Sequence, residues 1–135
     1  MSKQIRYILN KRKKGFHLIT DEILALLHQT QHTGIVHIFI QHTSAGLCIS
    51  ENADPTVRID LDASFDDLAP EDMSLYEHTA EGPDDMPAHI KSILVGSSVT
   101  IPITSGKLAL GTWQGIYLAE FREHAESRKI VITLL

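Results

Sequence analysis

Three of the eight histidines in the sequence occupy positions from which imidazole rings could bind a common ion. His42 ends the apolar run IVHIFIQH, His78 begins a loop rich in proline, glycine and aspartate, and His89 lies near the start of a helical segment. Neutral imidazole is a common metal ligand, and a histidine-rich site with an open coordination position is typical of catalytic zinc. We therefore predict that His42, His78 and His89 bind one divalent metal ion.

Each of these histidines also has a simpler interpretation. His42 could be a histidine at the edge of the core, bonded to a carbonyl group, and His89 could simply be exposed to solvent. The histidines are separated by 36 residues (42 to 78) and by 11 residues (78 to 89), which matches no general short motif. The metal site therefore depends on the fold bringing three distant segments together.

Polar residues that could assist such an ion follow His42 closely. Thr43 and Ser44 could donate hydrogen bonds to a bound anion. Glu51 and Asn52 end the next predicted strand, where they could orient a ligand histidine or a substrate group. Turn formation before the following helix is the alternative role for this pair.

A second group of candidates lies in the C-terminal third of the chain. Gly111 falls within a predicted strand, where glycine indicates a bulge or a close backbone approach. Trp113 and Gln114 follow it and could contact a ligand or a neighbouring subunit, unless the tryptophan is an ordinary core residue. Arg122 and Arg128 could each bind a phosphate if the fold brings them to the histidines.

The hydrophobic pattern predicts the elements that must position these residues. β-Branched and alternating segments predict strands, and apolar residues at helical spacing predict helices, one of them with Thr20 as its N-cap and another opened by Asp54 and Pro55. The predicted strands cover 4–9, 35–42, 45–51 and 127–135, the helices cover 20–31, 54–68 and 86–94, and a long hairpin covers 97–121. Two to three helices on a mainly antiparallel sheet or sandwich make a single α+β domain over residues 1–135.

Composition excludes several classes of protein. The net charge of -5 and the pI of about 5.8 argue against a nucleic-acid-binding protein. No apolar run is long enough to cross a membrane, the N-terminus lacks a secretory signal, and the single cysteine excludes an internal disulfide. We therefore expect a soluble cytoplasmic protein with no membrane partner.

Three blocks of sequence, in this order, resemble the YjbQ-like family, which is also called the secondary thiamine-phosphate synthase family. They are HTSAGLCISENADPTVRID, EHTAEGPDDMPAHIKSIL and IPITSGKLALGTWQGIYLAEF. The resemblance implies an α+β homotrimer with a metal, zinc above all, held by His42, His78 and His89 near the subunit boundary. It further implies a small phosphate-bearing substrate, since some members resemble enzymes that form thiamine phosphate weakly.

Two departures from the family pattern lie near the predicted site. Asp85 stands where the resemblance leads us to expect asparagine, and an extra carboxylate there could alter substrate preference. The segment EFREHAESRK lacks the glycine and proline of the family, so Arg128 is only matched loosely to a family arginine.

We predict a metal-dependent enzyme that acts on a phosphate or pyrophosphate substrate, as in thiamine-phosphate formation. Its expected catalytic residues are Thr43, Ser44, Glu51, Asn52 and Arg128. Trp113 and Gln114 are expected to bind a ligand. A metal-dependent phosphoesterase and a non-catalytic metal- or metabolite-binding protein are the alternatives.

Overall fold

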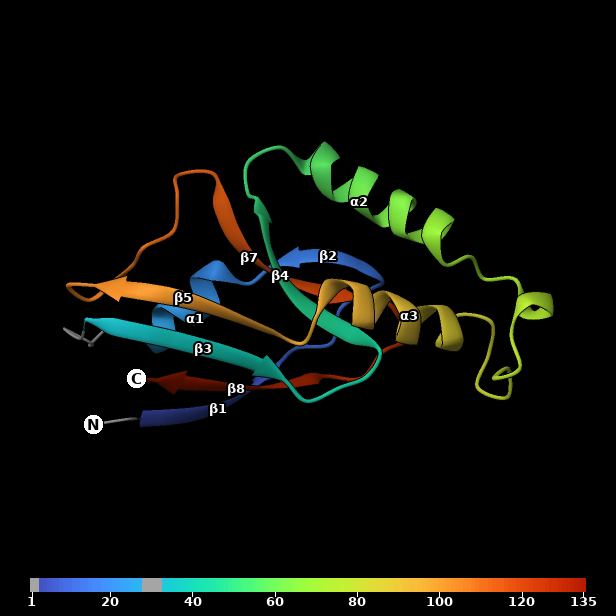
Figure 1. The fold of residues 1–135 in the computed structure, drawn as a ribbon, viewed down its shortest axis with the longest axis horizontal. Coiled ribbons are helices and arrows are strands. Elements are labelled where there is room, and N and C mark those ends of the chain that lie inside the picture. Colours follow the sequence, from blue (N-terminus) through green and yellow to red (C-terminus); the bar gives the residue numbers. More distant parts are fainter. Residues whose placement is uncertain (1–2, 28–32) are drawn as a thin grey trace.

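The computed structural model describes residues 3–27 and 33–135 and contains two antiparallel sheets and three α-helices (Figure 1). The α+β prediction is therefore confirmed. In chain order the elements are β1 (Lys3–Leu9), β2 (Gly15–Leu18), α1 (Thr20–Leu26), β3 (Gly34–Ile40), β4 (Ala45–Glu51), α2 (Pro55–Leu68), a 3-10 turn (Met73–Leu75), α3 (Asp85–Val95), β5 (Ser98–Thr104), β6 (Lys107–Leu108), β7 (Gln114–Glu120) and β8 (Arg128–Leu134).

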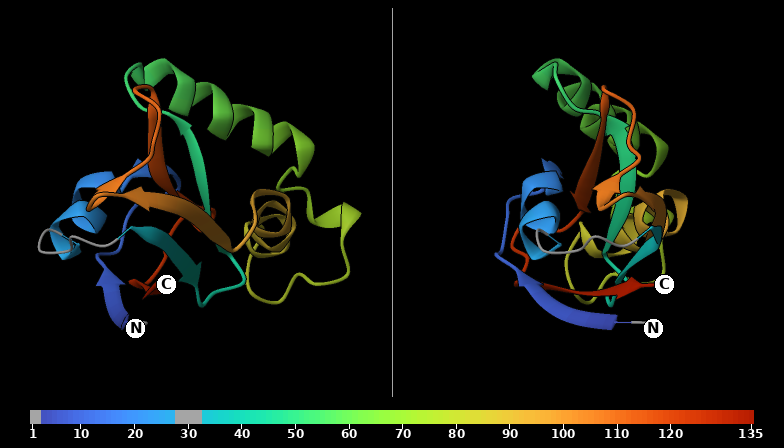
Figure 2. Two further views of the ribbon diagram at one scale, coloured as in Figure 1. Left: turned by 60° about the vertical axis from the view of Figure 1, so that its left-hand side comes forward. Right: turned by 90° about the vertical axis from the view of Figure 1, so that its left-hand side faces the viewer.

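The strands form a five-stranded sheet in the order β1-β8-β3-β5-β6 and a three-stranded sheet in the order β2-β7-β4. Figure 2 shows that the two sheets pack face to face, with α2 and α3 on the outer side of the smaller sheet. The predicted long hairpin over 97–121 is wrong in its second half. β5 turns back into β6 through Ser105 and Gly106, but β7 leaves for the other sheet, where it pairs with β2 and β4.

Alternation along β7 explains why this strand changes sheets. Ile116 and Leu118 point into the apolar core between the sheets, and Tyr117 and Ala119 point into a second core beneath the helices. All four are fully buried. A strand buried on both faces needs a packed layer on each side, and β7 has the larger sheet on one side and the helices on the other.

Helix α2 begins as predicted, with Asp54 accepting a hydrogen bond from the backbone N–H of Thr56 and Pro55 in the first turn. The apolar face of α2 places Leu61 and Phe65 against the second core. Two lysines beneath the helix add ion pairs. Lys91, only 1% exposed, lies 2.6 Å from Asp66, and Lys14 lies 3.0 Å from the same carboxylate.

Two details near the predicted elements differ from expectation. Thr20 is not the N-cap of α1, because its Oγ1 accepts a hydrogen bond from the Ile116 N–H across the sheet edge. Residues 28–31 of that predicted helix lie outside the described residues. Strand β3 ends at Ile40, so His42 follows the strand instead of ending it, although Val36, Ile38 and Ile40 are buried as predicted.

Close backbone contact fixes α3 against β4. The N–H of Leu47 donates to the carbonyl of Gly96, which ends α3 with a φ of 100°, and the Ser92 hydroxyl donates to the carbonyl of Ala45. A Cβ atom on Gly46 would lie 2.6 Å from the Gly96 oxygen and 2.9 Å from Val95 Cγ1. Because backbone atoms cannot move away as a flexible side chain can, only glycine allows this approach.

We expect Gly46→Ala to destabilise the fold by about 1 to 3 kcal/mol, since the added methyl group overlaps the backbone of α3. Urea unfolding followed by circular dichroism measures this change. Gly111→Ala is the matched control, because its Cβ would contact only the Gln114 side chain, at 3.3 Å, and we expect a loss of no more than about 0.5 kcal/mol. Equal stabilities of the two variants would contradict the argument.

Candidate metal centre

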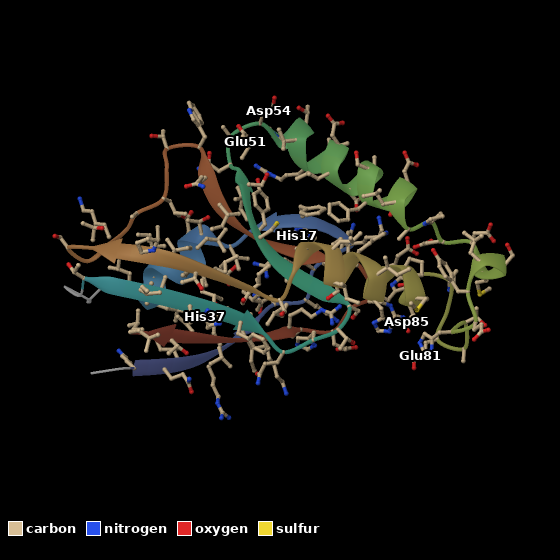
Figure 3. The ribbon with its side chains drawn as sticks, viewed as in Figure 1. His17, His37, Glu51, Asp54, Glu81 and Asp85 are labelled. Atoms are coloured by element: carbon tan, nitrogen blue, oxygen red, sulfur yellow. The ribbon has the colours of Figure 1, made fainter. Side chains whose placement is uncertain are left out.

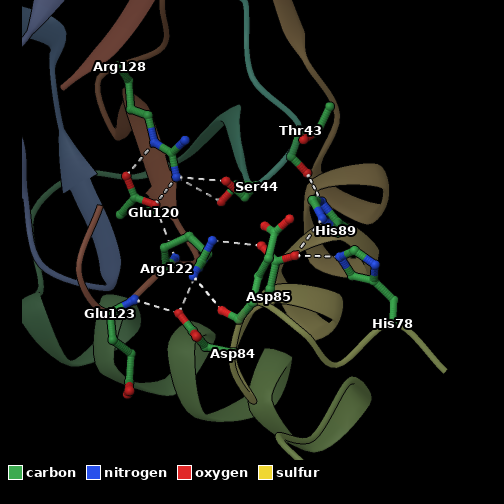
Figure 4. Close-up of polar contacts among 11 residues, drawn as sticks. Thr43, Ser44, His78, Asp84, Asp85, His89, Glu120, Arg122, Glu123 and Arg128 are labelled. Carbon is green, nitrogen blue, oxygen red and sulfur yellow. Dashed lines mark hydrogen bonds and ion pairs between the residues drawn. The ribbon is translucent and has the colours of Figure 1, made fainter. Parts of the chain in front are cut away.

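Two histidine side chains converge on one buried carboxylate. The Nε2 atoms of His78 and His89 lie 2.8 Å and 3.0 Å from Oδ2 of Asp85. Figure 4 shows these three residues at the N-terminal end of α3, with the two rings on the same side of the carboxylate. The Asp85 side chain is 2% exposed, and the His78 and His89 side chains are 48% and 29% exposed. Solvent therefore reaches these three residues from the side of the histidines and not from the side of Asp85.

Each ring is presented by a different local structure. Asp85 is the first residue of α3 and His89 lies one turn later, so both face the same way on the helix. His78 comes from the loop between the 3-10 turn and α3. The loop therefore folds back over the start of the helix and closes the group.

The contacts of His89 suit a positive charge beside Nε2, which either a proton or a metal ion can supply. Its Nδ1 lies 2.9 Å from the backbone oxygen of Thr43, which can only accept, so Nδ1 carries the proton. A neutral ring then has a lone pair at Nε2 facing the Oδ2 of Asp85, and two acceptors repel each other. The contact is favourable if the ring is an imidazolium or if a cation lies between the two atoms. A backbone carbonyl on the other ring nitrogen is also the usual support for a metal-bound histidine.

Two of the three distances among the candidate ligand atoms suit a shared metal ion. These atoms all lie within 4.8 Å of one another. Two ligand atoms about 2.0 to 2.2 Å from a shared ion, at angles of roughly 90° to 110°, lie roughly 2.8 to 3.6 Å apart. The two nitrogen–oxygen distances fall within that range. Two histidines and a carboxylate are a donor set of catalytic zinc and of iron(II), so this group could bind a metal.

Charged neighbours keep Asp85 ionised. Burial alone would raise the pKa of this carboxyl group, but the hydrogen bond from His78 and the nearby His89 and Arg122 outweigh burial and lower the pKa. Arg122 Nη1 donates to Oδ1 of Asp85 at 2.7 Å, and its Nε donates to Asp84 at 2.8 Å. The carboxylate is thus available as a negatively charged ligand.

His42 lies outside this group of three but beside it. His42 and His89 both line a cavity of about 630 Å³. Burial, aided by the nearby Arg128, lowers the pKa of His42. Its Nε2 accepts a hydrogen bond from the Lys129 backbone N–H at 2.8 Å, so this nitrogen is already engaged.

His78, Asp85 and His89 together are the candidate metal group, called the metal group below. Among the described residues, no Lys, Arg, Asp or Glu lines the cavity beside it. The residues that line this cavity are His42, Thr43, His89, Ser92, Ile93, Gly96 and Ser97. Hydroxyl groups and imidazoles provide its polar contacts, and Ile93 provides apolar surface. The cavity could therefore hold an uncharged organic group.

The structure separates the other predicted site residues into three environments. Thr43 lines the cavity, with its backbone oxygen on His89. Ser44 is buried, and its Oγ accepts a hydrogen bond from Arg128 at 3.0 Å. Arg128 also donates to both oxygens of Glu120, at 2.6 Å and 2.5 Å. This arginine is therefore engaged in a buried ion pair instead of facing the histidines.

The remaining predicted residues lie at the opposite end of β4. Figure 3 shows Glu51 there, at the start of α2, and Asp85 at the far end of the molecule. Glu51 accepts hydrogen bonds from the N–H groups of the turn before α2, and the Asn52 side chain donates to the Thr112 and Gln114 carbonyls. Trp113 is 64% exposed, so it is not a core residue. Within one chain these residues do not meet the metal group.

Sequence reasoning missed Asp85 as a candidate ligand and left the role of Arg122 undecided. The predicted helix began at Met86, so Asp85 was placed in the preceding loop, whereas α3 begins at Asp85. An aspartate four residues before a histidine on one helix face was the signal that could have identified it.

Comparison with known proteins places the chain in a family. The model of the family described as UPF0047 protein YjbQ-like matches residues 4–135. The chain belongs to this YjbQ-like family. A YjbQ protein of Salmonella typhimurium is 50% identical over 128 residues, covering 93% of this chain and 92% of that protein. A YjbQ protein of Escherichia coli O157:H7 is 48% identical with the same coverage.

Solved structures of YjbQ-like relatives share the fold. A conserved hypothetical protein of Thermus thermophilus is 37% identical with a TM-score of 0.87, covering 97% of this chain and 99% of that one. A family member from Clostridium acetobutylicum is 39% identical with a TM-score of 0.82, covering 95% and 97%. Within residues 3–27 and 33–135, no helix is long and apolar enough to cross a membrane.

We expect alanine at His78, Asp85 or His89 to lower the affinity for zinc or cobalt, because each change removes one ligand atom. Equilibrium dialysis followed by metal analysis measures the affinity. His42→Ala is the informative comparison, since the Nε2 of His42 is bonded to Lys129, and we expect that variant to retain its metal. Loss of metal from His42→Ala, with full retention by Asp85→Ala, would contradict this assignment.

Proposed function

We propose that this YjbQ-like protein is a metal-dependent enzyme that acts on a small phosphate- or pyrophosphate-bearing substrate. The observation that supports the proposal is the convergence of His78 and His89 on Oδ2 of Asp85 at the edge of an uncharged cavity. A divalent ion bound there would act as a Lewis acid toward a phosphoryl oxygen. Zinc is the first candidate, and iron(II) suits the same donors.

The residues around the cavity have defined roles in this proposal. His78, Asp85 and His89 hold the metal, and the Thr43 carbonyl fixes the ring of His89 through Nδ1. The exposed hydroxyl groups of Thr43 and Ser97 can donate hydrogen bonds to an anion. The apolar side chain of Ile93 can contact the organic part of the substrate.

Thiamine-phosphate formation, which the family resemblance suggested, fits such a site. In that reaction a carbon–oxygen bond breaks and pyrophosphate leaves with the bonding electrons, while a ring nitrogen supplies the pair for the new carbon–nitrogen bond. Negative charge accumulates on the leaving pyrophosphate, so preorganised positive charge and hydrogen-bond donors supply the expected acceleration. The neutral cavity suits an uncharged organic ring.

Turnover with defined substrates tests the proposal. We expect the zinc- or cobalt-loaded protein to form thiamine phosphate from its two phosphorylated precursors, and His89→Ala to lower kcat/KM by about 100-fold or more, as loss of a positioned metal does. His124→Ala is the control, because that exposed histidine lines a different cleft, and it should retain full activity. Pyrophosphate release measures the rate.

The other outcomes identify the alternatives. Hydrolysis of a generic phosphate ester that stops with a chelator, without thiamine phosphate, would favour a phosphoesterase. Metal binding without turnover of any phosphate substrate would favour a non-catalytic binding protein. Failure of the gene, even at high expression, to restore growth to cells lacking thiamine-phosphate synthase would count against the thiamine reaction.

We propose further that the chain assembles as a homotrimer. Exposed apolar side chains support this assembly. Ile93 and Leu94 of α3 are 82% and 57% exposed, and Trp113, just before β7, is 64% exposed. In sedimentation equilibrium we expect three times the 15.0 kDa mass of one chain, and a lower mass for Ile93→Asp. A wild-type mass of one chain at micromolar concentration would contradict the proposal.

A further inference from the structure

Arg122 contacts the metal group from the side opposite the histidines. Its Nη1 donates to Oδ1 of Asp85 at 2.7 Å, whereas His78 and His89 both contact Oδ2 (Figure 4). The two oxygens of one carboxylate are therefore assigned to different partners. No other arginine among the described residues has a hydrogen bond to this carboxylate.

The guanidinium group of Arg122 is itself held on several sides. Its Nε donates to Oδ2 of Asp84 at 2.8 Å, and its Nη2 donates to the backbone oxygen of Glu81 at 3.2 Å. The backbone N–H of Arg122 donates to Glu120, the carboxylate that pairs with Arg128. A planar group fixed at each nitrogen cannot turn, so its position relative to Asp85 is set before any ion binds.

From this arrangement, which rests on the metal site proposed above, we infer that Arg122 is a positioning residue that makes Asp85 a one-oxygen ligand. Oδ1 is held by Arg122, so Oδ2 is the oxygen that faces the histidines and that would bind an ion. Two histidines and one carboxylate oxygen would then supply three bonds to the ion, and further positions would stay open for substrate. A carboxylate released from Arg122 could bind through both oxygens and occupy one of those positions.

Charge supports the same role. Asp84 and Asp85 face one guanidinium group, so the three residues together carry one net negative charge. A divalent ion bound to Asp85 gives this region a net positive charge that favours a phosphate. Without Arg122, the negative charges of Asp84 and Asp85 would cancel the two positive charges of the ion.

Cobalt binding tests this role without any substrate. We expect Arg122→Met to bind Co²⁺ about 10- to 100-fold more weakly than the wild type, the usual effect of removing a residue that orients a metal ligand. We also expect weaker visible absorption bands, because cobalt(II) with more ligands absorbs less strongly. Arg12→Met is the matched control, since Arg12 pairs with Glu22 and takes no part in this network.

Arg122→Lys separates positioning from charge and covers the case in which the methionine variant does not fold. Lysine keeps the positive charge but cannot donate to Asp84 and Asp85 in the same planar arrangement. We expect it to fold, as judged by circular dichroism, and to show the altered cobalt spectrum with an intermediate affinity.

The results distinguish this inference from the proposed function. Wild-type affinity and an unchanged spectrum in folded Arg122→Lys or Arg122→Met would overturn the role of Arg122 while leaving the metal site in place. No cobalt binding by the wild-type protein would overturn both.

Discussion

The carboxylate of Asp85 is the group on which the candidate site depends. A buried carboxylate is costly unless both oxygens have partners, and here Arg122 takes one oxygen and two histidines take the other. Because Asp84 shares the same arginine, one negative charge remains to be balanced on the histidine side. Either a protonated histidine or a metal ion can supply that balance.

The fold presents this carboxylate through close packing of α3 on the smaller sheet. Gly46 lets the helix approach the backbone of β4, which sets the distance from His89 to the Thr43 carbonyl. Alternation along β7 fills the cores on both faces of that sheet, so the strand beneath α3 has little freedom to shift. Rigid elements therefore support the helix side of the site, and a loop supplies His78.

Strand β4 also separates the two groups of residues that the sequence suggested for function. Its first residues lie near the histidines, and its last residue, Glu51, lies beside the exposed Trp113 loop. One chain cannot join these groups.

Much of the fold was predictable, because local patterns determine it. β-Branched residues with a period of two identified β3, and the Asp54–Pro55 pair identified the start of α2. The course of β7 was not predictable, because its choice of sheet depends on burial of both faces by distant segments. The sequence grouped His78 and His89 with His42, but the structure groups them with Asp85. The place of Asp85 depended on one turn of helix, and helix ends are the least certain feature of a sequence.

Anomalous diffraction at the zinc absorption edge, from crystals grown with zinc, tests the central claim most directly. We predict a peak about 2.0 to 2.2 Å from Nε2 of His78, Nε2 of His89 and Oδ2 of Asp85, with Oδ1 still bonded to Arg122. A peak bound by His42 without Asp85, or no peak where the histidines meet the carboxylate, would contradict it.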